Sequence, residues 1–208
     1  MIDAARLKAM VGHIANTIER EKDRLCALDG VIGDADHGIA MSLGFNAARD
    51  AVEGLDETAD PTMVLNTAAK SFLNAVGASS GPLYATALMR GAAVVKGKAE
   101  LAADDVIAML QAMAKGIQDR GKAELGEKTM IDAWLPAASA AGEAISQGLA
   151  RALSAASEAA HAGAEATKNM VASKGRAERL GERSLGHMDP GAASAAMVIE
   201  AMRKSLTD

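Results

Sequence analysis

Apolar residues recur at helical spacing along most of this chain. The clearest stripe lies between residues 104 and 121, opened by Asp104 and closed near Gly121. Its members share one helix face: Val106, Met109, Leu110, Met113 and Ile117. The first segment carries a similar stripe: Leu7, Val11, Ile14, Ile18 and Leu25. Repeats of three and four residues place side chains on one face of an α-helix, so the chain is predicted to fold as packed helices.

The composition agrees with helices and disfavours sheets. Hydrophobic residues make up 50% of the 208 residues, whereas aromatic residues make up only 2%. Alanine is abundant and there are 12 methionines. Alanine and methionine are good helix formers, whereas strands favour β-branched and aromatic residues. We therefore expect an all-α protein with a single domain spanning residues 1–208.

Turn and cap signals divide the chain into eight expected helices. The first ends before residue 29, the next six cover approximately residues 37–53, 61–76, 82–95, 104–121, 131–148 and 150–173, and the last begins at residue 190. Asp60-Pro61 and Asp189-Pro190 each combine an N-cap residue with proline at the first helical position. Pro136 falls inside the sixth helix and predicts either a kink or a late start there.

The glycine-rich and polar connections alternate along the chain. They span residues 29–38, 77–82, 121–130 and 174–191. In an up-and-down array of helices, alternate connections lie at the same end. We therefore expect an eight-helix antiparallel barrel or bundle in which these four connections form one site.

Charge and cysteine content exclude some functions. The formal net charge is −5 without a basic block, which argues against nucleic-acid binding. The single cysteine, Cys26, excludes an internal disulfide and fits a reducing compartment. The first residues, Met-Ile-Asp, show no apolar signal core, and no apolar run approaches the ~20 residues of a membrane span. We expect a cytoplasmic protein.

The first polar connection has the composition of a metal site. It brings Asp29, Asp34 and Asp36 together with three glycines in eleven residues, 28–38. Carboxylate oxygens are the preferred ligands of hard cations such as Mg²⁺. An Asp/Gly cluster between helices is often only a solvated turn, and this alternative stays open for the loop alone.

The other connections suggest phosphate binding. Gly38, Ser79 and Ser80 lie at expected helix starts, where free N–H groups suit phosphate oxygens. Either Arg176 or Arg183 could neutralise phosphate charge. His37 is interpreted as a hydrogen-bond donor or as a cap residue. The purely structural alternatives are that Asp189 is only an N-cap, and that Lys122, Lys128 and Arg183 are solvated charges.

Several longer motifs resemble the dihydroxyacetone kinase L-subunit (DhaL) family. They are Gly33-Asp-Ala-Asp-His-Gly38 with Met41, Ser80-Gly-Pro-Leu83, Arg120-Gly-Lys-Ala-Glu124, Gly126-Glu-Lys-Thr-Met130 and Gly181-Glu-Arg-Ser-Leu-Gly-His-Met-Asp-Pro-Gly191. They follow one another in order and cover essentially the whole chain. The chain departs from the family at Ala40, where Asn or Thr is frequent, so a side-chain contact to phosphate is lost and only a backbone N–H is left to make it.

The resemblance implies an eight-helix barrel that binds ADP or ATP at one end through Mg²⁺, with two ions expected. It implies that the metal ligands are Asp29, Asp34 and Asp36. The nucleotide contacts that it implies are His37, Gly38, Ile39, Ala40, Ser79, Ser80, Gly121, Met130, Arg176, Asp189, Pro190 and Gly191. In this assignment Met130 faces the adenine and Ser80 faces a phosphate.

The resemblance also implies the activity. The chain would be a kinase subunit that passes a phosphoryl group from the Mg-bound nucleotide to dihydroxyacetone or a similar short ketose. The ketose is held covalently on a separate K subunit, so no catalytic residue is assigned to this chain. The Gly-Asp-Ala-Asp-His pattern resembles the type in which a phosphotransferase-system M subunit recharges bound ADP.

Three alternatives stay open from the sequence. The first is a subunit of an ATP-dependent kinase for another ketose such as erythrulose. The second is a regulatory subunit that signals its nucleotide state to a transcription factor. The third is a helical bundle with a structural cation. The sequence also leaves open a homodimer and an apolar ligand inside the barrel.

Overall fold

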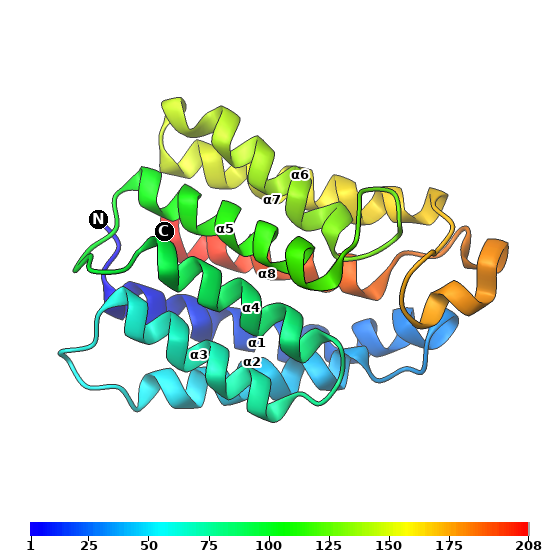
Figure 1. Ribbon diagram of the computed structural model, residues 1–208, viewed down its shortest axis with the longest axis horizontal. Helices are drawn as coiled ribbons and strands as arrows, with labels where there is room; N and C mark the ends of the chain where they lie inside the picture. The colour runs from blue at the N-terminus through cyan, green and yellow to red at the C-terminus, as the bar shows by residue number, and fades with distance from the viewer. Residues whose placement is uncertain (208) are drawn as a thin grey trace.

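The computed structural model describes residues 1–207 and consists of helices that run antiparallel to their neighbours (Figure 1). The α-helices are α1 (Ala4–Ile32), α2 (His37–Glu53), α3 (Pro61–Ala75), α4 (Ser80–Val94), α5 (Ala103–Gly121), α6 (Ile131–Ala144), α7 (Leu149–Ala166) and α8 (Pro190–Thr207). Three short 3₁₀-helices are η1 (Ile145–Gln147), η2 (Thr167–Asn169) and η3 (Arg176–Ser184). Within residues 1–207 no strand forms, and one isolated β-bridge joins Ile2 to Leu101. The all-α prediction is confirmed.

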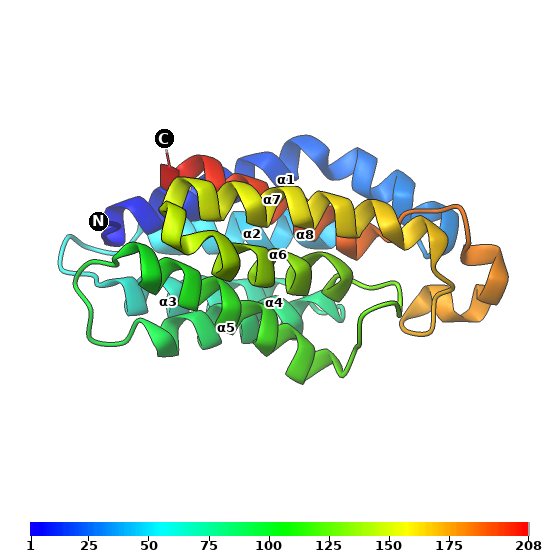
Figure 2. The same cartoon turned by 90° about the horizontal axis from the view of Figure 1, so that it is seen from above.

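The helices form a closed ring. Each α-helix packs against the next one along the chain, and α8 returns to pack against α1 (Figure 2). This arrangement is the expected up-and-down barrel. No helix among residues 1–207 combines the length and the apolar character needed to cross a membrane.

Capping side chains fix where the helices begin. The Asp60 carboxylate accepts a hydrogen bond from Met63 N at 2.7 Å, and Pro61 is the first helical residue of α3. The expected opening of α5 at Asp104 is wrong by one residue, because the helix begins at Ala103. The Asp105 carboxylate holds that start by accepting a hydrogen bond from Ala102 N at 3.0 Å.

Two helix ends differ from the prediction. α1 continues to Ile32, so Asp29 belongs to its last turn and not to the following loop. α7 ends at Ala166 instead of near residue 173. The long connection after α7 is not simply a loop, because it contains η2 and η3. Both differences concern helix termini, where hydrophobic spacing says little about the last helical residue.

Pro136 lies inside α6, which begins before it at Ile131, so the expected late start is wrong. Proline has no N–H to donate to the carbonyl of Asp132, four residues earlier. α7 approaches this carbonyl closely through Gly163, where a Cβ atom would lie 1.9 Å from the oxygen. Glycine at that position therefore lets α7 pack directly on the turn that proline interrupts.

All four aromatic residues of the chain gather into one cluster in the core. The Phe45 and Phe72 ring centroids are 4.9 Å apart, and Tyr84 lies 5.5 Å from Phe45 and 6.3 Å from Trp134. Small and flexible side chains fill the remaining core. A gap of about 20 Å³ beside Tyr84 and Trp134 is close to the volume that one water molecule occupies.

Candidate functional site

The four glycine-rich and polar connections do meet at one end of the barrel, as the alternation predicts. Together they line a cavity of about 550 Å³, within the range of small-molecule sites. The connections lie at the right-hand end of the barrel in Figure 1. Lining residues come from the α1–α2, α3–α4, α5–α6 and α7–α8 connections and from the helix ends beside them.

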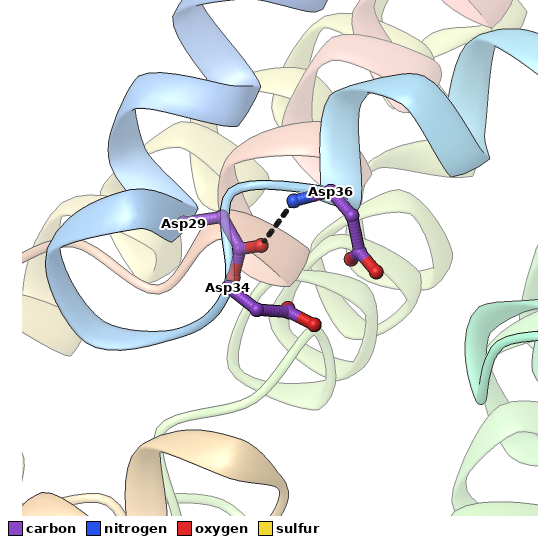
Figure 3. A group of neighbouring side chains, drawn as sticks. All are labelled: Asp29, Asp34 and Asp36. Atoms are coloured by element: carbon purple, nitrogen blue, oxygen red, sulfur yellow. Dashed lines mark hydrogen bonds between the residues drawn. The ribbon is translucent and has the colours of Figure 1, made fainter.

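Three carboxylates form an acidic cluster at this cavity: Asp29, Asp34 and Asp36 (Figure 3). One carboxylate oxygen from each lies within 4.8 Å of the others. Asp29 is buried, and the other two are exposed. Three hard oxygen donors at this spacing fit a divalent cation such as Mg²⁺.

Main-chain hydrogen bonds hold Asp29 in place. Its Oδ2 accepts hydrogen bonds from Asp36 N at 3.0 Å and from His37 N at 3.2 Å. Gly33 N in turn donates to the Asp29 carbonyl. A Cβ atom at Gly33 would lie 2.1 Å from Asp29 Oδ1, so only glycine lets the chain turn this closely around the carboxylate.

Arg176 is the arginine that the structure brings to the acidic cluster. Its guanidinium forms an ion pair with Asp34, and its Nη2 lies 3.9 Å from Asp36 Oδ2. The side chain is 62% exposed, so it can move toward an anion in the cavity. Arg183 is exposed and is not among the residues that line the cavity.

His37 begins α2 and points its ring into the barrel. The ring Nε2 lies 2.9 Å from Ser194 Oγ of α8. Burial lowers the pKa of His37, and the nearby Asp29 carboxylate opposes that shift. The helix cap position belongs to Asp36, so the interpretation of His37 as a cap residue is wrong.

Most of the other predicted nucleotide residues also line the cavity. They are Ala40, Ser79, Ser80, Gly121, Met130, Arg176, Asp189, Pro190 and Gly191. Two of the predicted contacts are not among the lining residues. Gly38 is buried, and the side chain of Ile39 is 51% exposed.

Asp189 combines a structural and an electrostatic role. Its carboxylate caps α8 by accepting a hydrogen bond from Ala192 N at 2.7 Å, as the cap-plus-proline pattern predicts. The side chain opens only partly to the surface but is densely surrounded by protein. Burial raises its pKa to about 7, although the Ala192 hydrogen bond and Lys128 lower it.

Lys128 is the main residue that the sequence reasoning missed. The expectation of a solvated charge is wrong, because the residue is 1% exposed. Its Nζ donates hydrogen bonds to the carbonyls of Thr167, at 2.6 Å, and His187. Burial lowers the pKa of Lys128, and Asp189 and Asp132 oppose this shift. Lys128 thereby joins the α5–α6 connection to both ends of the α7–α8 connection.

Asp132 is a second missed residue, and it folds the α5–α6 connection. This carboxylate is 2% exposed and accepts hydrogen bonds from Gly126 N at 2.6 Å and Thr129 N at 2.8 Å. The turn places Met130 at the cavity wall. The position of Asp132 in the first turn of α6 is the only sequence signal of this role, because acidic residues are favoured there.

Comparison with known proteins places this chain in a family. The family model described as the DAK2 domain matches residues 31–204. The chain is 41% identical over 207 residues to the ADP-binding subunit DhaL of PEP-dependent dihydroxyacetone kinase 2 from Listeria innocua, covering 95% of this chain and 94% of the relative. It is 40% identical over 184 residues to the corresponding Escherichia coli subunit, covering 86% of each chain.

A solved structure has the same fold. It is the dihydroxyacetone kinase from C. freundii in complex with AMP-PNP and Mg²⁺, with a TM-score of 0.75 and 27% identity. The match covers 97% of this chain and 34% of that kinase, so this chain spans about a third of its length. The chain belongs to the DAK2 domain family.

Proposed function

We propose that this chain is the ADP-binding subunit of a PEP-dependent dihydroxyacetone kinase. The observation that carries the proposal is the acidic cluster, which gathers three carboxylate oxygens within 4.8 Å beside a nucleotide-sized cavity. Its two bacterial relatives are named as such subunits and match this chain over most of their length. Residues 1–208 would act as one nucleotide-binding unit in the cytoplasm.

The acidic cluster would hold Mg²⁺, and two ions are expected. A bound Mg²⁺ bridges phosphate oxygens and offsets their charge during transfer. The nucleotide contacts would be His37, Gly38, Ile39, Ala40, Ser79, Ser80, Gly121, Met130, Arg176, Asp189, Pro190 and Gly191. Met130 is 7% exposed and supplies an apolar wall for the adenine. Ser80 lies at the start of α4, where main-chain N–H groups suit a phosphate.

The residues of this chain act on the phosphates by position and charge. Arg176 already pairs with Asp34, so it can transfer to a phosphate oxygen when a cation occupies the acidic cluster. The partially positive N-terminal ends of α2 and α4 also face the cavity. We assign no general base to this chain, because the acceptor hydroxyl would be presented by the separate K subunit.

The partners follow from the subunit arrangement. A K subunit would hold the ketose, and an M subunit would rephosphorylate ADP without releasing it. The chain spans 94% of its Listeria relative but about a third of the C. freundii kinase. The Listeria relative is named as an ADP-binding subunit, and that name supports a system with separate subunits. The proposal also allows two further interactions, one with a transcription regulator and one with a second copy of this chain in a homodimer.

Native mass spectrometry of the purified protein tests the proposal first. The sample is dialysed extensively in Mg²⁺ buffer and weighed again. ADP with Mg²⁺ that survives dialysis supports a resident cofactor. Empty protein that binds ATP reversibly indicates instead an ATP-dependent kinase subunit, including one for a ketose such as erythrulose. Failure to bind either nucleotide refutes the proposed function.

The variant Asp34→Ala tests the metal assignment. Mg²⁺-dependent ADP binding should be lost, whereas Asp50→Ala, an exposed aspartate on α2, should bind like the wild type. Wild-type ADP affinity in Asp34→Ala would refute the assignment. Phosphoryl transfer is then measured with the K and M subunits added. Nucleotide binding without transfer would favour a regulatory subunit.

A further inference from the structure

At the cavity floor and just below it, four helices each contribute a polar group to the barrel interior. They are α2, α4, α6 and α8, all of which begin at the cavity end. The residues are His37, Tyr84, Trp134 and Ser194. Tyr84, Trp134 and Ser194 are essentially inaccessible to solvent, at 2%, 1% and 0% exposure.

The polar atoms of this group are incompletely paired. Tyr84 Oη and Trp134 Nε1 are buried, and neither has a partner within hydrogen-bond geometry. Burial raises the pKa of Tyr84, whereas Ser194 and Trp134 act to lower it, so both groups lie near the hydroxyl. Buried donors without partners are costly, and a small shift of these side chains would pair both of them.

Each of these groups can donate or accept only certain hydrogen bonds, and this gives a hydrogen-bond chain among them one direction. The indole N–H of Trp134 can only donate, so after such a shift it would donate to Tyr84 Oη. The Tyr84 hydroxyl would then donate to Ser194 Oγ. Ser194 has one proton and two acceptors in reach: His37 Nε2 at 2.9 Å and the Gly191 carbonyl at 3.0 Å. The carbonyl lies in the first turn of α8 and can accept a main-chain bond in the helix, whereas Nε2 has no other partner in the described residues.

The surroundings of the imidazole agree with this choice. Asp29 Oδ2 lies close to His37, because it accepts a hydrogen bond from His37 N at 3.2 Å. A proton on the ring nitrogen away from Ser194 could be donated to a phosphate oxygen, whereas a lone pair there could not.

We propose that Trp134, Tyr84 and Ser194 form a directional hydrogen-bond chain that makes His37 Nε2 an acceptor and fixes Nδ1 as the N–H donor facing the nucleotide site. Ser194 is a positioning residue in this scheme, because it acts through His37. Hydrogen bonds in such a chain polarise one another, which strengthens the choice of tautomer. The use of the donor for phosphate rests on the proposed function, but the tautomer itself does not.

¹⁵N NMR of the full-length protein labelled with ¹⁵N-histidine tests the hydrogen-bond chain directly. The spectra are taken at pH 8 without nucleotide, because an imidazole of ordinary or lowered pKa is neutral there. His37→Gln assigns the signal, and the exposed His13 and His161 serve as internal references. The expected result is a proton on Nδ1 of His37. A proton mainly on Nε2 would overturn the proposal without any further variant.

Two variants test whether the hydrogen-bond chain determines the tautomer of His37. Ser194→Ala should move the His37 proton toward Nε2, and Tyr84→Phe should give a mixture of tautomers. Ser157→Ala is the matched control, since Ser157 is also a buried helix serine but bonds to Glu200 at 2.5 Å, away from the site. An unchanged His37 tautomer in both Ser194→Ala and Tyr84→Phe would refute the proposal.

Calorimetry with Mg²⁺ and ADP then connects the tautomer to binding. Ser194→Ala should weaken ADP binding by about tenfold, the usual effect of misplacing one hydrogen bond to a charged group. Ser157→Ala should bind as the wild type does. Equal ADP affinity in Ser194→Ala and Ser157→Ala would refute the role in binding. Wild-type protein that binds no ADP would refute the proposed function. The NMR result would still show whether the hydrogen-bond chain sets the tautomer of His37.

Discussion

Replacing Lys128 by methionine should destabilise the protein far more than the same change at an exposed lysine of the same connection. Lys128 is 1% exposed and donates to two carbonyls, those of Thr167 and His187. Methionine has a similar length and fills the space, so no large cavity adds to the effect. The substitution removes both hydrogen bonds. The His187 carbonyl is then left unpaired, whereas the Thr167 carbonyl keeps its hydrogen bond from Met170 N at 3.1 Å.

The magnitude follows from these contacts. The unpaired His187 carbonyl costs about 1–3 kcal/mol, and the lost hydrogen bond at Thr167, whose carbonyl keeps another partner, costs about 0.5–1.5 kcal/mol. Removing a buried charge returns part of this cost, because burial already lowers the pKa of Lys128. We expect a net loss of about 1–3 kcal/mol in the free energy of unfolding. For a chain of this size, Tm should fall by about 2–12 °C.

Lys122→Met is the matched control. Lys122 is exposed in the same connection and has the same left-handed backbone, with φ of 54° against 62° at Lys128. Any strain of methionine at positive φ is therefore common to both variants. Urea denaturation of the two proteins, followed by circular dichroism, gives the difference. Unfolding free energies within about 0.5 kcal/mol of each other would refute the stabilising role of the two hydrogen bonds from buried Lys128.

Three further results are expected. Gly33→Ala should weaken Mg²⁺-dependent ADP binding at least tenfold in calorimetry, because its Cβ would displace the Asp29 carboxylate; Gly77→Ala, whose Cβ meets open space, should bind normally, and equal affinities would contradict the role of Gly33. Arg176→Gln should tighten the binding of Mg²⁺ alone and weaken the binding of Mg·ADP, since the guanidinium competes with cations for the acidic cluster but attracts phosphate; parallel changes in both titrations would argue against this. Asp189→Asn should change how stability depends on pH. The folded pKa of Asp189, about 7, exceeds the unfolded value of 3.8. Below pH ~4 the wild type should therefore gain at most about 4 kcal/mol in unfolding free energy relative to the variant, and it should lose this advantage as pH rises through 7. A pH-independent difference in urea denaturation would refute the raised pKa.

The helical framework could be predicted because its signals are local. The stripe from Val106 to Ile117 defines α5, and cap-plus-proline pairs mark the starts of α3 and α8. Alternation of turn-forming segments was enough to place four connections at one end. The end of α1 was misjudged, because Asp29 and Gly30 have the composition of a turn although they are helical. Packing against α2 and α8 outweighs their weak helix preference.

The supporting side chains of the site could not be predicted in the same way. Lys128 lies in a connection without periodicity, so nothing in the local sequence shows that its side chain is buried. Its partners, Thr167 and His187, are 39 and 59 residues further along the chain. Ser194 and His37 are separated by 157 residues. Pairings of this kind depend on how the ring of helices closes, which a single sequence does not encode locally.

The closure of the ring also explains why this end of the barrel suits an anion. Helix dipoles of antiparallel neighbours largely cancel at a distance, so the sign of the field in the cavity depends on which helix ends reach it. The first residues of α2, α4, α6 and α8 all line the cavity. Of the four helices that end there, only α1 and α5 contribute lining residues among residues 1–207, and those of α5 are Ile117, Arg120 and Gly121. Four helix N-termini therefore meet the cavity, against two C-termini. The partial positive charge of the N-termini opposes the negative charge of the acidic cluster, and this combination favours an anion that brings its own cation.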